Sequence, residues 1–169
     1  MTTQPTLASE PFVLGPQEGT HLHFLDNRAT VKVAAGPRGS MSVVEFQAPK
    51  GFGPPRHIHD NEDELFIVLS GELLFYSGDE QIPGPEGTYA FLPRALPHTF
   101  QVLTETATFV NVTSSTTHIP EFDQMVMDLG ITVPEPTMPD PMQIDPARVA
   151  EVCADHGIQI VGPPPAPLS

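Results

Sequence analysis

Hydrophobic residues in the first two thirds of the chain occur in short runs, and turn-forming segments such as Gly-Pro, Ser-Gly-Asp and Pro-Gly-Pro separate them. Many short strands joined by Gly- and Pro-containing turns are typical of a β-sandwich or a β-barrel. We therefore predict an all-β region. Its predicted strands are Phe12–Leu14, His21–Leu25, Thr30–Ala34, Met41–Phe46, Leu65–Leu69, Leu73–Tyr76, Tyr89–Leu92, Thr99–Leu103 and Thr108–Val112.

Two short helices are predicted after the β region. The first has hydrophobic side chains at helical spacing between a Pro and a Gly, at Phe122, Met125, Val126 and Leu129. The second follows Asp145, a favourable N-cap, with Pro146 in its first turn and Gly157 at its end. The Pro-rich segment 131–144 between the helices is predicted to be an extended tether.

These patterns divide the chain into three parts. Residues 1–10 are expected to form a flexible N-terminal arm, and residues 11–115 a single β domain. Residues 116–169 are expected to form a helical extension that packs on the outside of this domain. No sequence period of about 20–50 residues recurs, so a repeat architecture is not expected.

The charge of the chain excludes several classes of partner. Its 169 residues include 7 Lys and Arg against 21 Asp and Glu, a formal net charge of −14, which repels nucleic acid and anionic membrane surfaces. No apolar run approaches the roughly 20 residues that span a bilayer, and the first residues do not resemble a signal peptide. We therefore expect a cytoplasmic protein that binds neither nucleic acid nor membranes.

One stretch of sequence combines residues that bind metals. On a strand, His57 and His59 point to the same face, because side chains alternate. Glu64 follows a short polar turn, so its carboxylate can return to that face. His98 opens a later strand after a Pro-containing turn. Three imidazoles and one carboxylate suit a divalent transition metal better than Ca²⁺ or Mg²⁺. We predict one such ion per chain, with coordination positions open to a substrate or O2.

Other polar residues have simpler interpretations. A His-x-His pair alone is commonly just exposed or hydrogen-bonded, and we interpret His21 and His23 as structural because no carboxylate follows at comparable spacing. We interpret Asp60, Glu62 and Asp63 as a solvated acidic turn.

Three aromatic residues near the predicted metal site are candidate substrate contacts, although packing in the core is the simpler interpretation of each. They are Phe66, Phe91 and Phe100.

The two metal-binding segments resemble the two cupin motifs. The first motif, G-x5-H-x-H-x4-E-x6-G, is matched by Gly51, His57, His59, Glu64 and Gly71. The second, G-x5-P-x-G-x2-H-x3-N, is matched by Gly87, Pro93 and His98, with Ala95 and Val102 in place of its last Gly and its Asn. The resemblance implies an all-β cupin barrel, a double-stranded β-helix or jelly roll, followed by an extension of two short helices. Cupins of this kind are often dimers, so a homodimer is expected.

A narrower resemblance involves the C-terminal extension. Residues 122–130 and 145–165 are similar to the tail of single-domain bacterial quercetin 2,3-dioxygenases. This resemblance implies an oxidoreductase that cleaves a flavonol, or a related enolic aromatic substrate, with O2. It also implies Ni, Mn, Co or Fe bound by His57, His59, Glu64 and His98, with Glu64 acting as the catalytic base. Zn or Cu is compatible with the same donors.

Two alternatives remain open from the sequence. The first is a non-oxidative metal-dependent cupin enzyme, such as an isomerase, epimerase or decarboxylase. Its substrate would not be phosphorylated, because only Arg56 and Arg94 lie near the motifs to bind a phosphate. The second is a cupin that binds a small molecule without catalysis, which the complete set of metal-binding residues disfavours.

Overall fold

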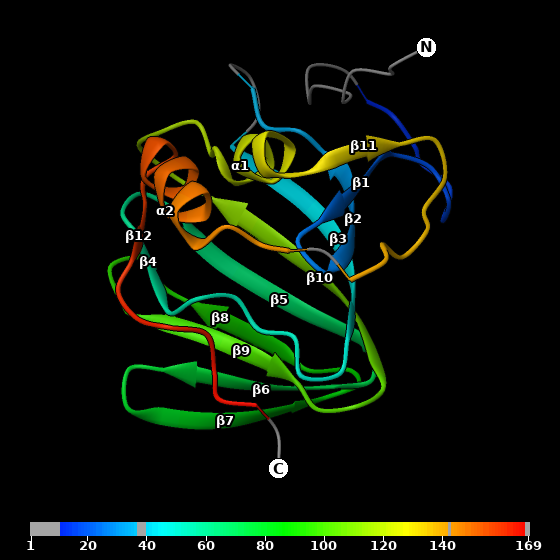
Figure 1. The fold of residues 1–169 in the computed structure, drawn as a ribbon. Helices are drawn as coiled ribbons and strands as arrows, with labels where there is room; N and C mark the ends of the chain where they lie inside the picture. The colour runs from blue at the N-terminus through cyan, green and yellow to red at the C-terminus, as the bar shows by residue number, and fades with distance from the viewer. Residues whose placement is uncertain (1–10, 37–39, 142, 168–169) are drawn as a thin grey trace.

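The structure, a computed structural model, describes residues 11–36, 40–141 and 143–167 (Figure 1). The arm predicted at residues 1–10 lies outside the described residues. Most of the regular secondary structure of the described chain is β-strand, arranged in two sheets, with two short helices near the C-terminal end. This is the cupin fold that the resemblance implied, and the prediction of an all-β fold with two C-terminal helices is confirmed.

The two sheets differ in size, and neighbouring strands in both are antiparallel. The larger sheet has the order β11 (Ile131–Val133), β1 (Thr20–Phe24), β2 (Asn27–Val33), β3 (Met41–Pro49), β10 (Thr106–Ser114), β5 (Asp63–Ser70) and β8 (Tyr89–Leu92). The smaller sheet has the order β12 (Ile158–Ile160), β4 (His57–His59), β9 (His98–Val102), β6 (Glu72–Ser77) and β7 (Glu80–Pro85).

Aromatic side chains fill much of the space between the sheets. Alternate residues of β3 and β10 point inward, which places Phe46 opposite Phe109 with ring centroids 5.4 Å apart. From the smaller sheet, the Phe100 ring lies 5.1 Å from that of Phe109 and 5.5 Å from that of Phe66. Burying a Phe side chain contributes about 1.5–3 kcal/mol to stability, so these rings hold the two sheets together.

The predicted strands agree with the structure at eight of the nine runs. Phe12–Leu14 is the exception, because it forms no strand. Strand β7 was not predicted, since its sequence Glu-Gln-Ile-Pro-Gly-Pro has the composition of a turn. The strand is tolerated because it lies at the end of its sheet and pairs with β6 alone, so its prolines remove no hydrogen bond from a second neighbour.

Both predicted helices are present, as α1 (Phe122–Leu129) and α2 (Pro146–Asp155). Asp145 caps α2 as expected: its Oδ1 accepts a hydrogen bond from the backbone N–H of Ala147 at 3.0 Å. Within the described residues, no helix is long and apolar enough to cross a membrane.

The C-terminal segment also adds two strands that were not predicted. The expected tether 131–144 begins with β11, which pairs with β1, and the chain after α2 forms β12, which pairs with β4. Each strand has three residues, too few for a period-two pattern to show in the sequence. The extension therefore contributes an edge strand to each sheet.

Candidate metal centre

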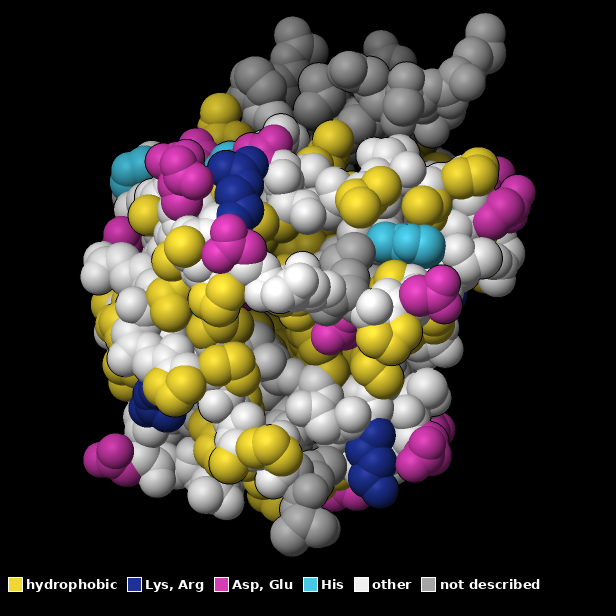
Figure 2. Space-filling model, in the orientation of Figure 1, with side chains coloured by type: hydrophobic (Ala, Val, Ile, Leu, Met, Phe, Trp, Pro, Cys, Tyr) yellow, Lys and Arg dark blue, Asp and Glu magenta, His cyan; other side chains and the backbone are white. Residues whose placement is uncertain are grey.

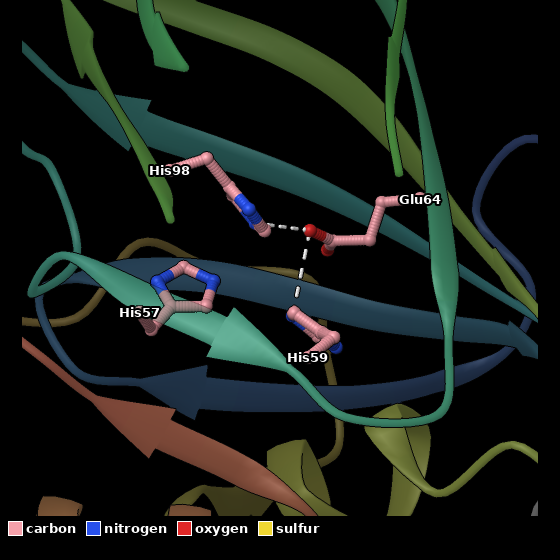
Figure 3. Close-up of side chains that lie close together, drawn as sticks. All are labelled: His57, His59, Glu64 and His98. Atoms are coloured by element: carbon pink, nitrogen blue, oxygen red, sulfur yellow. Dashed lines mark hydrogen bonds and ion pairs between the residues drawn. The ribbon is translucent and has the colours of Figure 1, made fainter. Parts of the chain in front are cut away.

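The four residues predicted to bind a metal come together from three strands of both sheets. His57 and His59 lie on β4, His98 on β9 and Glu64 on β5 (Figure 3). One nitrogen or oxygen atom from each residue lies within 4.8 Å of the corresponding atoms of the others. His57 pairs directly with His98 across β4 and β9, and their ring centroids are 4.5 Å apart.

Backbone carbonyls orient two of the imidazoles. His57 Nδ1 donates a hydrogen bond to Pro55 O at 2.7 Å, and His98 Nδ1 donates one to Leu96 O at 2.9 Å. A neutral ring that is protonated on Nδ1 carries its lone pair on Nε2. In both residues, Nε2 is therefore the nitrogen available to a metal.

The geometry around Glu64 suits a bound cation. His98 Nε2 lies 2.6 Å from Glu64 Oε2, and in a neutral ring this places a nitrogen lone pair opposite a carboxylate oxygen. His59 Nε2 is 3.4 Å from the same oxygen, and neither ring nitrogen of His59 has a hydrogen-bond partner among the described residues. A buried polar atom without a partner costs roughly 1–3 kcal/mol. One divalent cation shared by these groups would satisfy both Nε2 atoms, so the residues fit a metal.

The electrostatics agree with this arrangement. Desolvation, and then the neighbouring His98 and His59, lower the pKa of His57 to about 3, so this imidazole is neutral and keeps its lone pair at neutral pH. Burial by itself would raise the pKa of Glu64, but His59 and His98 outweigh it and lower that pKa. Burial would lower the pKa of His59, but Glu64 and Glu62 outweigh it and raise that pKa. The carboxylates therefore attract positive charge to the centre of the cluster, whether a proton or a metal ion.

Glu62 is not part of a solvated turn, which corrects the interpretation made from the sequence. Its side chain is buried, and its Oε2 lies 3.4 Å from His59 Nδ1. Its Oε1 accepts a hydrogen bond from the backbone N–H of Glu121, just before α1. The C-terminal extension covers this turn, and local sequence spacing carries no information about that contact.

Asn111 is a second neighbour of the cluster that the sequence analysis missed. Its side-chain Nδ2 donates a hydrogen bond to Glu64 Oε1 at 2.8 Å. The residue lies on β10, 47 positions from Glu64, among the inward-facing side chains of Ala107, Phe109 and Thr113. In the sequence, the single sign that Asn111 contacts the cluster was an amide side chain at a position that strand alternation turns inward.

The turn between β8 and β9 positions His98. Arg94 binds Asp63 through a side-chain contact of 2.6 Å and a backbone hydrogen bond of 2.9 Å, which lowers the pKa of Asp63. Ala95 has a left-handed backbone with φ of 63°, and its N–H donates to His59 O at 2.9 Å. The turn therefore keeps a conformation that favours glycine, although alanine occupies the position.

A pocket adjoins the cluster. It contains about 640 Å³ of empty space, including its opening to solvent. Its polar lining residues are Asn27, His57, Glu64 and Asn111, and most of the rest are apolar, including Phe46, Phe66, Phe100, Phe109 and Phe122. In the orientation of Figure 1, Figure 2 shows hydrophobic side chains around a hollow near the middle of the face.

The structure brings two of the three candidate substrate contacts to this pocket. Phe66 and Phe100 line it, whereas Phe91 is not among its lining residues and is 63% exposed. On β8 the neighbouring Leu92 points inward and is buried, so Phe91 points outward.

The second His-x-His pair lies outside the cluster. His21 Nδ1 is 3.1 Å from Thr30 Oγ1, and His23 Nε2 is 3.0 Å from Thr137 Oγ1. These hydrogen bonds agree with the structural interpretation of both residues.

The sequence comparison agrees with the cupin fold. Residues 43–113 match the family model described as a cupin domain, and the chain contains a cupin domain over this segment. Among curated proteins, it is similar to quercetin 2,3-dioxygenase of Bacillus subtilis (strain 168), with 28% identity over 104 residues. The match covers 61% of this chain and 31% of that relative, so the chain spans about a third of the relative's length.

The comparison with solved structures gives partial matches. KdgF from Halomonas sp. has a TM-score of 0.49 at 18% identity, covering 53% of this chain and 79% of that one. A Silicibacter pomeroyi protein described as a sugar phosphate isomerase from a cupin superfamily has a TM-score of 0.47 at 23% identity. The match covers 54% of this chain and 60% of that one.

Proposed function

We propose that this protein is a metal-dependent dioxygenase that cleaves a flavonol, or a related enolic aromatic compound, with O2. The observation that carries the proposal is a three-histidine, one-glutamate cluster at an otherwise largely apolar, aromatic-lined pocket. The distant similarity to a bacterial quercetin 2,3-dioxygenase supports it.

The cluster would hold one divalent transition metal through His57, His59, Glu64 and His98. Nickel, manganese, cobalt and iron are the metals that the resemblance implies, and zinc or copper also fits these donors. When bound, such an ion supplies a Lewis acid to which adjacent oxygens of an enolic substrate and O2 can be brought together.

The pocket supplies the contacts for a planar aromatic substrate. Phe66 and Phe100 lie in a T-shaped, edge-to-face arrangement with ring centroids 5.5 Å apart, and both line the pocket. Their apolar surface gains from contact with the rings of a substrate and excludes water from the reacting edge. A polar cluster beside an apolar surface therefore suits an aromatic compound that carries oxygens on one edge.

Glu64 is the group proposed to accept the substrate hydroxyl proton. Its carboxylate is buried at the pocket, and Asn111 holds one oxygen while the other faces His59 and His98. Loss of the contact with either imidazole would let desolvation raise its pKa and make it a stronger base. The imidazoles cannot replace it, because each uses its lone pair in holding the metal.

A non-oxidative cupin enzyme acting on a small molecule without phosphate is the second candidate. Among the described residues, no Lys or Arg lines the pocket. The guanidinium of Arg94 is bound to Asp63, and that of Arg56 donates to Gly78 O. These contacts disfavour a phosphorylated substrate for this second class of enzyme.

Oxygen uptake separates the two candidates. Purified protein is reloaded with each metal in turn and mixed with quercetin, and O2 consumption and carbon monoxide release are measured. We expect both with at least one metal. Turnover of a substrate without O2, or no O2 uptake with any metal, would favour the second candidate.

The expected homodimer stays a prediction that analytical ultracentrifugation tests.

A further inference from the structure

Asn27 is a buried amide without a hydrogen-bond partner. Asn27 is the first residue of β2, and it is 1% exposed. Neither Nδ2 nor Oδ1 of its side chain has a partner among the described residues. Buried amides are normally satisfied, and those that are not call for an explanation such as an absent ligand or water. Asn27 also lines the pocket that adjoins the metal centre.

The strand register places Asn27 away from the metal centre. Ala29, Phe46 and Phe109 pair in one row across β2, β3 and β10. Asn27 lies two residues to one side of this row, and Asn111, which binds Glu64, lies two residues to the other side. Four residue steps correspond to roughly 13 Å along the strands. The pocket thus has polar groups at two places, with the Phe46 and Phe109 rings between them.

The turn that carries Asn27 into the pocket is also unusual. Leu25 lies in the loop between β1 and β2 with a left-handed φ of 53°, a conformation that a leucine rarely adopts. Its side chain is packed against the core and lines the same pocket. Unfavourable backbone conformations of this kind persist where the surrounding structure holds them, and they concentrate at binding sites.

We propose that Asn27 is a specificity-determining residue that hydrogen-bonds a hydroxyl group at the end of the substrate remote from the metal centre. The inference rests on the proposed function and names the substrate class more closely: a planar aromatic compound with oxygens at both ends. A carboxamide offers a donor and an acceptor together, so it can receive a hydroxyl in either orientation. A site built to bind a hydroxyl discriminates against the analogue that lacks it, because the amide then stays unpaired.

Binding without turnover tests the inference. Metal-loaded protein is titrated by calorimetry in the absence of O2 with 3-hydroxyflavone, 4′-hydroxyflavonol and 7-hydroxyflavonol. The two hydroxylated compounds place a hydroxyl at opposite ends of the same ring system. We expect one of them to bind wild-type protein about 3- to 10-fold more tightly than the parent compound, the range that one hydrogen bond supplies.

The variants are Asn27→Leu, which has similar size, and Asn27→Ala in case the first does not fold. Either should lose the preference for the hydroxylated compound while keeping the affinity for 3-hydroxyflavone. Thr30→Val is the matched control, because Thr30 is a buried polar residue of the same strand that binds His21 and does not line the pocket. It should keep the preference.

The outcomes separate this inference from the proposed function. If all three compounds bind wild-type protein equally, or the preference survives in the Asn27 variants, the inference is wrong whatever the oxygen-uptake assay shows. A preference that depends on Asn27 without O2 consumption would support the inference and overturn the dioxygenase proposal. An equal loss of affinity for all three compounds would show that Asn27 holds a structural water only, and would also overturn the inference.

Discussion

Asn111 and Glu64 are joined by a hydrogen bond of 2.8 Å between Nδ2 and Oε1, across the neighbouring strands β10 and β5. The bond fixes one carboxylate oxygen and leaves Oε2 facing His59 and His98. In the proposed metal centre Asn111 would be a positioning residue for Glu64, since hydrogen bonds to a metal ligand orient it and adjust its basicity.

Replacing Asn111 should weaken metal binding. Asn111→Leu is expected to lower metal affinity about 10- to 100-fold, because Glu64 loses the bond that orients it. Competition with a chromophoric chelator measures the change. Thr113→Val, on the same strand, removes a hydroxyl that bonds Ser42 and not Glu64, so this variant should keep wild-type affinity. Unchanged affinity in Asn111→Leu would show that the hydrogen bond has no positioning role.

The histidines should account for metal content. The double variant His57→Ala and His98→Ala is expected to lose most of the one ion per chain, because two of the four donors disappear. Elemental analysis of the purified protein measures occupancy. His21→Ala removes a histidine that bonds Thr30 outside the cluster and should retain the metal. Full occupancy in the double variant would mean that the ion binds elsewhere.

Glu64 should matter more for turnover than for metal content. Glu64→Gln, reloaded with metal, keeps the shape of the side chain but cannot accept a proton, so turnover of quercetin should fall roughly 10²- to 10⁴-fold. Oxygen uptake normalised to bound metal measures this. Glu45→Gln is the control, because Glu45 pairs with Arg28 and does not line the pocket. Near wild-type turnover in Glu64→Gln would eliminate the base role and leave the metal-binding role untouched.

Replacing Ala95 by glycine should leave the protein at least as stable as the wild type. The φ of 63° at Ala95 disfavours any side chain, so Ala95→Gly is expected to raise the free energy of unfolding by up to about 1 kcal/mol. Ala90→Gly, in the extended strand β8, should instead lower it by about 0.5–1 kcal/mol. Urea denaturation compares the two variants, and equal destabilisation by both would contradict the strain at Ala95.

Cys153 should be unreactive while the protein is folded. Burial raises the pKa of its thiol to about 11 from 9.0, so little thiolate forms near neutral pH. Alkylation with iodoacetamide should be much slower in the folded protein than in urea. The folded state keeps a proton that the unfolded state loses between about pH 9 and 11, so stability should fall as the pH rises through this range. Cys153→Ala should lessen that fall, and an unchanged pH dependence would argue against the raised pKa.

Several features were predictable because local geometry decides them. Strand alternation puts His57 and His59 on one face, whatever the rest of the fold does. The capping of α2 by Asp145 follows from three neighbouring residues, since the bond joins its side chain to Ala147. The turn before His98 ends one strand and begins the next, as its prolines indicate.

The sequence by itself thus determined eight of the strands and both helices, because each depends on the backbone conformation of a few adjacent residues. The spacing of the two motifs identified the four residues of the cluster. The tertiary structure decided what surrounds them. Asn111 reaches Glu64 because β10 pairs with β5, and Glu62 is buried because it lies against the residue that precedes α1. Phe91 faces outward while Phe66 faces the pocket, although both strands belong to one sheet. Such contacts join residues far apart in the chain, and burial depends on which elements pack together, a property that no short segment carries.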